Sequence, residues 1–244
     1  MGILHKRMNM EGCLLNAAGI GLNPKTIIDV GAANGTPAIY KIFPKANHIL
    51  VEPLKEYTSS LESVIEKLDK AEYILAAASD RSGEVVINVH PDLVGSSLFL
   101  EDEDSDVNGY ERTVPAVTLD EIAVQKKIEA PCLIKVDAQG SELKVLNGAA
   151  VLLKETELVI LEVSFYKVFK GGPQIIDCIE FMKKNNFIPY DMFDPLYRPL
   201  DGALFQVDIA FVPENSILRR QHFYATKQQR DIQNREFGKI LNIG

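Results

Sequence analysis

The sequence predicts an α/β protein built on a mostly parallel, seven-stranded sheet of the Rossmann type. Three observations support this fold class. Strand-like and helix-like segments alternate from residue 27 to residue 77, which is the order of a parallel sheet. The first strand, in residues 27–30, leads through a glycine-containing turn into a helix start. Two late strand-like segments, 187–193 and 204–212, are close enough along the chain to pair antiparallel.

The turn after the first strand is the most informative element. Ile27–Val30 is apolar apart from one acid, as expected of a strand buried on both faces. Gly31 and Gly35 allow the turn backbone conformations that a side chain would restrict. Thr36 is a suitable N-cap and Pro37 a suitable first helical residue, so a helix is predicted to begin there.

The remaining elements follow from periodicity. A strand at 49–51 precedes a helix at 53–70, whose apolar residues recur at helical spacing, and a third strand at 73–77 ends near Ser79 and Asp80. Residues 81–118 break the alternation and form a predicted insertion with two short strands. Afterwards the sequence predicts parallel strands at 132–136 and 158–161, and helices at 119–127, 143–153 and 175–185.

These elements divide the chain into three predicted parts. Residues 1–23 form an N-terminal helical segment, and residues 24–213 form the main domain with the insertion at 81–118. Residues 214–244 form a polar, helix-prone extension. The sequence contains no internal repeat, and no long linker separates the three parts. A length of 244 residues is enough for one substantial domain.

Composition narrows the function classes. The net charge is −8 and basic residues form no stripe, which argues against a nucleic-acid partner. Three scattered cysteines form neither a disulfide framework nor a CxxC pair, and four scattered histidines show no zinc spacing. The sequence shows no signal peptide and no apolar run long enough to span a bilayer, so we expect a cytoplasmic protein without a membrane partner.

The first unit predicts a cofactor that contains a nucleoside. Glu52 ends the second strand 21 positions after Gly31, where a carboxylate can accept hydrogen bonds from ribose hydroxyls. The middle glycine of a dinucleotide motif is replaced by Ala33, and Asp29 brings negative charge close by. Such a site disfavours the phosphates of NAD and favours S-adenosylmethionine, which carries a sulfonium and no phosphate.

Several segments together resemble the FkbM-type methyltransferases. The family signature is approximately K-I-D-V-E-G-x-E followed by L-x-G-A, and the matching segments here are Asp29–Ala32, Val51–Pro53, Leu119–Asp120, Lys135–Glu142 and Leu146–Ala149. The similarity covers about residues 24–165. It implies the class I methyltransferase fold and transfer of a methyl group from S-adenosylmethionine, typically to a hydroxyl of a sugar or natural product. The chain departs from the signature at Gln139, where the family usually has an acid.

The candidate site residues end the predicted parallel strands, where ligands bind in open α/β sheets. Asp137 is the candidate general base or acceptor-orienting group, with Glu142 and Glu162 next, and Glu162 can alternatively pair with Lys135 or Lys167. Tyr166 and Phe169 are candidates for a lip over the acceptor. The candidates for cofactor binding are Asp29, Gly31, Ala32, Asn34, Gly35, Glu52, Pro53, Ser79 and Asp80.

Alternatives stay open at this point. Asp137 and Glu142 can instead serve only the N-terminus of the following helix. The three acids Asp137, Glu142 and Glu162 can also hold a divalent cation, although their spacing does not require one. A binding module that has lost turnover is compatible with Gln139, an NAD-dependent oxidoreductase is less compatible, and a homo-oligomer is compatible with the apolar residues of the C-terminal extension.

Overall fold

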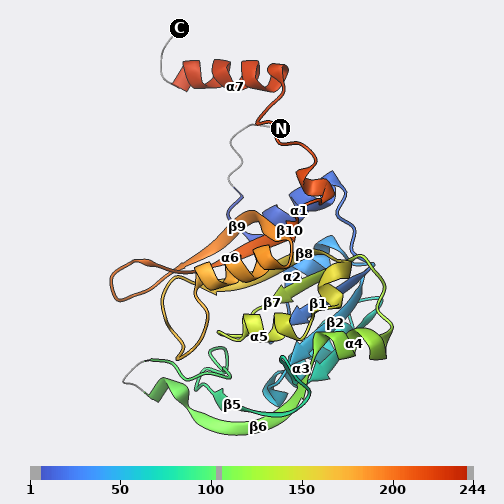
Figure 1. Cartoon of the computed structure of the whole chain (residues 1–244), viewed down its shortest axis with the longest axis vertical. Helices are drawn as coiled ribbons and strands as arrows, with labels where there is room; N and C mark the ends of the chain where they lie inside the picture. Colours follow the sequence, from blue (N-terminus) through green and yellow to red (C-terminus); the bar gives the residue numbers. More distant parts are fainter. Residues whose placement is uncertain (1–6, 103–105, 241–244) are drawn as a thin grey trace.

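The structure is a computed structural model that describes residues 7–102 and 106–240. Its core is a seven-stranded sheet in the order β3-β2-β1-β7-β8-β10-β9 (Figure 1). Strand β10 alone runs in the direction opposite to the other six strands. The strands are β1 Thr26–Val30, β2 Asn47–Glu52, β3 Ala71–Leu75, β7 Cys132–Val136, β8 Thr156–Ser164, β9 Phe187–Tyr197 and β10 Leu204–Pro213. The predicted class I methyltransferase sheet, with its terminal antiparallel hairpin, is confirmed.

Helices cover both faces of this sheet because the central strands are apolar on both faces. Ile27, Leu50 and Leu133 belong to one buried cluster, and their neighbours Ile28 and Ile49 belong to the other. The first cluster packs under α1 Met10–Ile20, α2 Pro37–Ile42 and α3 Thr58–Ile65. The second packs under α4 Leu119–Lys126, α5 Glu142–Asn147 and α6 Ile175–Lys184.

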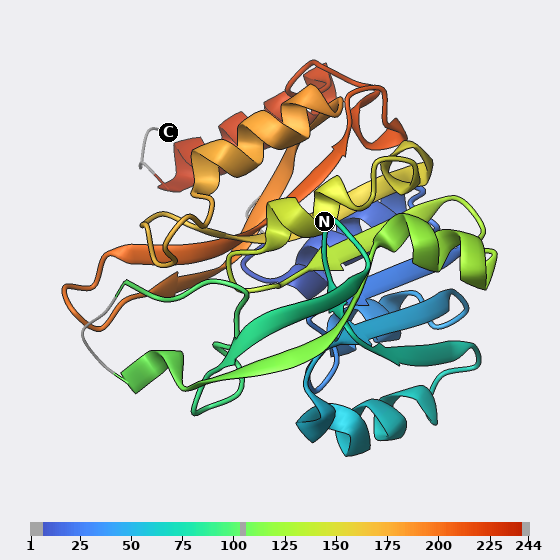
Figure 2. The same cartoon turned by 60° about the horizontal axis from the view of Figure 1, so that its bottom comes forward.

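A second, three-stranded sheet lies at one end of the large sheet (Figures 1 and 2). It consists of β4 Ala77–Ala78, β5 Gly83–Val89 and β6 Tyr110–Val117, with β5 antiparallel to β6. This confirms the predicted small β insertion. The third core strand ends earlier than predicted, at Leu75, because Ala77 and Ala78 pair with β6 in the small sheet instead.

Helices are shorter than their periodicity predicted. Residues 53–70 contain the 3-10 turn η1 Lys55–Tyr57 and the short helix α3, and residues 143–153 are divided between α5 and the 3-10 turn η3 Leu152–Glu155. Apolar spacing continues through these turns because they still face the core. The 3-10 turns η2 Asp106–Asn108 and η4 Ile217–Arg219 and the helix α7 Lys227–Ile240 complete the described elements. In Figure 1, α7 lies beyond the sheet on the side opposite the small sheet.

Of the predicted parts of the chain, residues 1–6, 103–105 and 241–244 lie outside the described residues. No helix of the described chain is long and apolar enough to cross a membrane.

Candidate functional site

One face of the large sheet collects polar side chains at the strand ends. Side chains alternate between the two faces of a strand, so residues two apart share a face. Asp29 lies opposite Lys135 in the β1–β7 register, and Glu162 lies opposite Asp208 in the β8–β10 register. Glu52 follows Leu50 by two residues, and Leu50 pairs with Asp29. The fold therefore places these five side chains on the same face.

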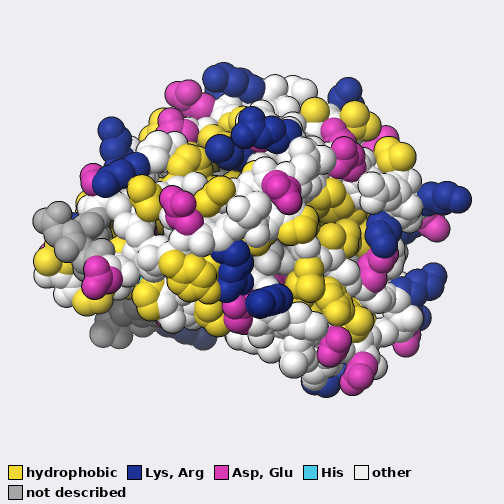
Figure 3. All heavy atoms as spheres, turned by 90° about the horizontal axis from the view of Figure 1, so that it is seen from below, with side chains coloured by type: hydrophobic (Ala, Val, Ile, Leu, Met, Phe, Trp, Pro, Cys, Tyr) yellow, Lys and Arg dark blue, Asp and Glu magenta, His cyan; other side chains and the backbone are white. Residues whose placement is uncertain are grey.

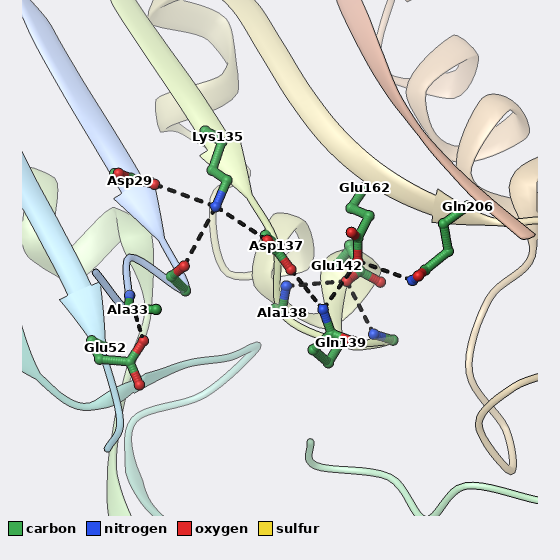
Figure 4. A network of polar contacts seen from close by, with 12 residues as sticks. Asp29, Ala33, Glu52, Lys135, Asp137, Ala138, Gln139, Glu142, Glu162 and Gln206 are labelled. Carbon is green, nitrogen blue, oxygen red and sulfur yellow. Dashed lines mark hydrogen bonds and ion pairs between the residues drawn. The ribbon is translucent and has the colours of Figure 1, made fainter. Parts of the chain in front are cut away.

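Lys135 is the central charge of this group (Figure 4). Its Nζ lies 3.4 Å from Asp137 Oδ2, 3.6 Å from Asp29 Oδ1 and 3.4 Å from the Gly31 carbonyl oxygen. Burial alone would lower the pKa of Lys135, but Asp137 and Asp29 raise it by more, so the ammonium stays charged at physiological pH. Lys135 was part of the sequence motif, but its role as a bridge between two carboxylates depends on strand register.

Asp29 comes just before the turn that contains Gly31 and Gly35, and it does not line the cavity described below. Its side chain is 1% exposed, and Oδ2 accepts a hydrogen bond of 2.6 Å from the Tyr40 hydroxyl. Burial and the Asp29 charge raise the pKa of Tyr40, so this hydroxyl remains a donor. The predicted contact of Asp29 with a cofactor therefore stays a prediction, while its contacts within the protein support the turn from below.

The turn itself requires glycine at Gly31. Gly31 has a φ of +68°, and a Cβ there would lie 1.8 Å from the Asp137 carbonyl oxygen. The Gly31 turn and the Asp137 loop, which follow the paired strands β1 and β7, therefore leave no room between them for a Cβ. Any larger residue must push the Asp137 loop away from the turn.

We expect Gly31→Ala to lower the free energy of unfolding by about 1–3 kcal/mol from its backbone conformation alone, with the steric clash added. Gly202→Ala is the matched control, because Gly202 has a φ of +74° and no atom within 4 Å of the added Cβ. Denaturant unfolding of both variants measures the difference. Equal losses of stability would show that the close approach to Asp137 costs nothing.

Glu52 holds the backbone on the other side of the turn. Its Oε2 accepts the Ala33 N–H at 3.0 Å, and its Oε1 accepts the Leu54 N–H at 2.9 Å. Burial raises the pKa of Glu52, and these two hydrogen bonds oppose that shift. A carboxylate has about four lone-pair sites, so two remain for a ligand.

A cavity opens between the strand ends and the insertion. It has about 690 Å³ of empty space, counting the part open to solvent. Of the predicted site residues, it is lined by Gly31, Glu52, Pro53 and Asp137. Among the described residues that line it, none is lysine or arginine.

The insertion supplies a wall of this cavity that the sequence motifs did not indicate. Leu93, Ser96 and Leu98 line it, as does Ser97, whose Oγ donates a hydrogen bond of 2.6 Å to the Gln139 carbonyl oxygen. The insertion is therefore attached to the loop after β7. No signal in the sequence indicated which residues of 81–118 reach the cavity, because the contact joins segments about forty positions apart.

Other predicted site residues lie outside the cavity lining. Ala32, Asn34 and Gly35 belong to the turn but do not line it. Ala77 and Ala78 take the place predicted for Ser79 and Asp80, because β3 ends at Leu75. The Ser79 N–H instead donates to Val117, and its carbonyl oxygen lies 2.1 Å from where a Cβ on Gly148 would be. This contact explains the glycine of the L-x-G-A motif.

The two further catalytic candidates are buried among other acids. Glu142 accepts the N–H groups of Ala138 and Gly140, so its carboxylate holds its own loop. Burial raises its pKa to about 7, against these hydrogen bonds. Glu162 contacts neither Lys135 nor Lys167 by an ion pair; it accepts hydrogen bonds of 3.0 Å from the amides of Gln139 and Gln206.

The part of this polar group that lies on β8 and β10 consists of Glu162, Gln206 and Asp208. Burial and, next, the charge of Asp137 raise the pKa of Glu162 to about 8 and that of Asp208 to about 7. Polar residues at 206 and 208 within an otherwise apolar strand were the available sequence signal for this part. Among the described residues, no three histidine, cysteine or acidic side chains are grouped to hold a metal ion.

Phe169 and Tyr166, which are predicted to form a lip over the acceptor, have different surroundings. Phe169 is buried against Gly140, where a Cβ would lie 2.5 Å from its ring. Tyr166 is more exposed; its ring stacks with the Phe205 ring and is also contacted by the Arg198 guanidinium. On the face seen in Figure 3, at the end of the molecule where the small sheet lies, lysines and arginines are interspersed with acids and do not gather in one area.

Solved structures of similar fold include several methyltransferases. Magnesium protoporphyrin IX methyltransferase from Synechocystis PCC 6803, with bound SAM, is 7% identical with a TM-score of 0.46 and coverage of 83% of this chain and 76% of that one. Precorrin-6y C5,15-methyltransferase from Geobacter metallireducens is 10% identical with a TM-score of 0.43 and coverage of 85% and 91%. The 1,6-didemethyltoxoflavin-N1-methyltransferase from Burkholderia thailandensis is 12% identical with a TM-score of 0.41 and coverage of 83% and 76%.

None of the curated proteins matches this chain by sequence. The family model described as the methyltransferase FkbM domain does match, over residues 29–189. That range is well over half of the chain and contains the glycine turn, Glu52 and the whole Asp137 loop. The resemblance predicted from the motifs is confirmed, and the chain belongs to the FkbM methyltransferase family.

Proposed function

We propose that this protein transfers the methyl group of S-adenosylmethionine to a hydroxyl group of a small, uncharged acceptor such as a sugar, glycan or natural product. The observation that most supports the proposal is the acidic character of the cavity lining. Glu52 and Asp137 line it at the ends of two core strands, and no lysine or arginine lines it among the described residues. A sulfonium is favoured beside carboxylates, whereas the diphosphate of a dinucleotide is repelled by them.

The cofactor is proposed to lie along the turn. Glu52 would accept the ribose hydroxyls with its free lone pairs, beside the two backbone groups that it already holds. The apolar side chains of Val51, Leu54 and Ile87 line the same cavity and suit an adenine ring. The glycine turn would contact the methionine part, close to Asp137.

Asp137 is the proposed general base. It follows β7 directly, lines the cavity, and its side chain is 33% exposed, unlike the buried carboxylates around it. Methyl transfer from a sulfonium is an in-line displacement, in which the acceptor oxygen bonds to the methyl carbon as the carbon–sulfur bond breaks. The acceptor hydroxyl must also lose its proton, and we propose that Asp137 accepts it.

The acceptor class follows from the surrounding charge. The acids that line the cavity are Glu52 and Asp137, and Lys135, which pairs with Asp137, does not line it. An acceptor that carries phosphates would be repelled here, so we propose a neutral hydroxyl compound and no nucleic acid. The three cysteines are free and buried, which fits the proposed cytoplasmic location.

Glu52→Gln tests the cofactor part of the proposal. We expect binding of S-adenosylmethionine and S-adenosylhomocysteine to weaken about 10- to 100-fold, because hydrogen bonds to a charged group contribute roughly 1.5–3 kcal/mol. Isothermal titration calorimetry measures both ligands. Glu56→Gln is the matched control, since Glu56 pairs with Arg112 and does not line the cavity. A folded wild-type protein that binds neither ligand would sink the proposed function.

A further inference from the structure

The amide of Gln139 joins two carboxylates at the edge of the cavity (Figure 4). Its Nε2 lies 2.8 Å from Asp137 Oδ1 and 3.0 Å from Glu162 Oε2. A primary amide has two N–H donors on one nitrogen, so both are used here. Gln139 thereby connects the loop after β7 with strand β8, and its main-chain carbonyl oxygen accepts a hydrogen bond from the Ser97 hydroxyl of the insertion.

The backbone of Gln139 shows that this arrangement is held in place. Its φ is +46°, a conformation that few residues other than glycine adopt. Such backbone strain persists only where surrounding contacts enforce it. The contacts present are the two carboxylates, the Ser97 hydroxyl and the packing of Phe169 on Gly140.

An acid at position 139, as in the family signature, cannot make the same contacts. A carboxylate has no donor and would repel an ionised Asp137 or Glu162, and a protonated carboxyl has a single O–H for one of them. The amide, in contrast, keeps both of its donors at every pH. The charged and titratable groups around it are Asp29, Lys135, Asp137, Glu142, Glu162 and Asp208.

We propose that Gln139 is a positioning residue that holds Asp137 and Glu162 at a fixed separation beside the cavity, with two donors that do not themselves titrate. The proposal rests on the proposed function for its catalytic meaning. On this proposal, the glutamine that stands where the family signature has an acid positions other residues, and it does not indicate a loss of activity.

The test compares Gln139→Glu with Gln139→Leu. The glutamate variant has nearly the same shape and loses the donors when it ionises, whereas the leucine variant loses them at every pH. Binding of S-adenosylhomocysteine is measured by calorimetry at pH 5.5 and pH 8. This ligand lacks the sulfonium, so the added charge of the variant has no attraction to a charged sulfur that would offset the lost contacts.

For Gln139→Glu we expect binding about three- to tenfold weaker than wild type at pH 8, because repulsion displaces the Asp137 loop, whose main chain packs against the Gly31 turn. We expect this deficit to shrink at pH 5.5. For Gln139→Leu we expect a similar deficit at both pH values. Burial among acids raises the pKa of the new carboxyl. The native state then binds more protons than the unfolded state, so stability relative to wild type falls as pH rises. We expect a melting temperature lower than wild type by about 4 °C or more at pH 8, and closer to wild type at pH 5.5.

The outcomes separate the two proposals. If Gln139→Glu matches wild type in melting and binding at both pH values, the positioning role is wrong, whatever the cofactor is. If melting changes with pH and binding does not, Gln139 is purely structural and the positioning role is also wrong. If wild type binds neither S-adenosylhomocysteine nor S-adenosylmethionine, the proposed function is wrong. The proposed role of Gln139 in catalysis is then wrong as well.

Discussion

Replacing Asp137 by asparagine is expected to lower kcat for methyl transfer by about 10²–10⁴-fold, the usual contribution of a general base. Asparagine keeps the size of the side chain and can still contact Lys135 through its oxygen, but it cannot take up the hydroxyl proton. We expect S-adenosylhomocysteine to bind the variant within about threefold of wild type, because the cofactor contacts assigned to Glu52 remain.

The measurement is release of S-adenosylhomocysteine with a hydroxyl acceptor that wild type is first shown to methylate. Asp69→Asn is the control, because Asp69 is exposed in the turn before β3, away from the cavity. A variant with full kcat would remove Asp137 from the chemistry and leave positioning of donor and acceptor as the source of rate. Loss of binding together with kcat would indicate that Asp137 holds the cofactor instead.

Replacing Lys135 by methionine is expected to lower the free energy of unfolding by about 3–5 kcal/mol, the cost of leaving buried charges without their partner. Asp29, which is 1% exposed, would keep only the Tyr40 hydrogen bond, and Asp137 would lose its only ion pair among the described residues. Methionine fills a similar volume, so lost packing contributes little.

The pH dependence gives this prediction a further check. The raised pKa of Lys135 keeps the ammonium charged in the folded state. A raised folded pKa means that its contribution is fully present below the pKa of the unfolded chain, about 10.4, and is lost only above it. The wild-type contribution of Lys135 is therefore constant between about pH 6 and 9.

Chemical denaturation at pH 7 measures the effect, with Lys126→Met as the control. Lys126 pairs with Glu72 on the surface, where an ion pair contributes about 0–1 kcal/mol. If both variants lose the same stability, the buried bridge between Asp29 and Asp137 contributes no more than a surface pair. A folded Lys135→Met protein also shows whether the charge affects cofactor binding.

The sequence predicted the sheet because its strongest signals are local. Apolar runs such as 132–136, the turn at Gly31 and the amphipathic helix at 175–185 depend on neighbours within a few residues. Helix lengths were overestimated, since a short helix followed by a 3-10 turn keeps the same apolar spacing. The family followed from the motif around Asp137, in which chemistry and close packing both constrain the residues.

Local patterns in the sequence were enough to predict the fold class, the family and the strand ends at Glu52 and Asp137. The three-dimensional structure was needed to show which polar groups contact one another. Strand register places Lys135 between Asp29 and Asp137, and it places Asp208 opposite Glu162. The Gln139 amide reaches Glu162 across 23 positions of the chain. Such pairings depend on how distant strands align, and periodicity within one segment contains no information about its partner in another.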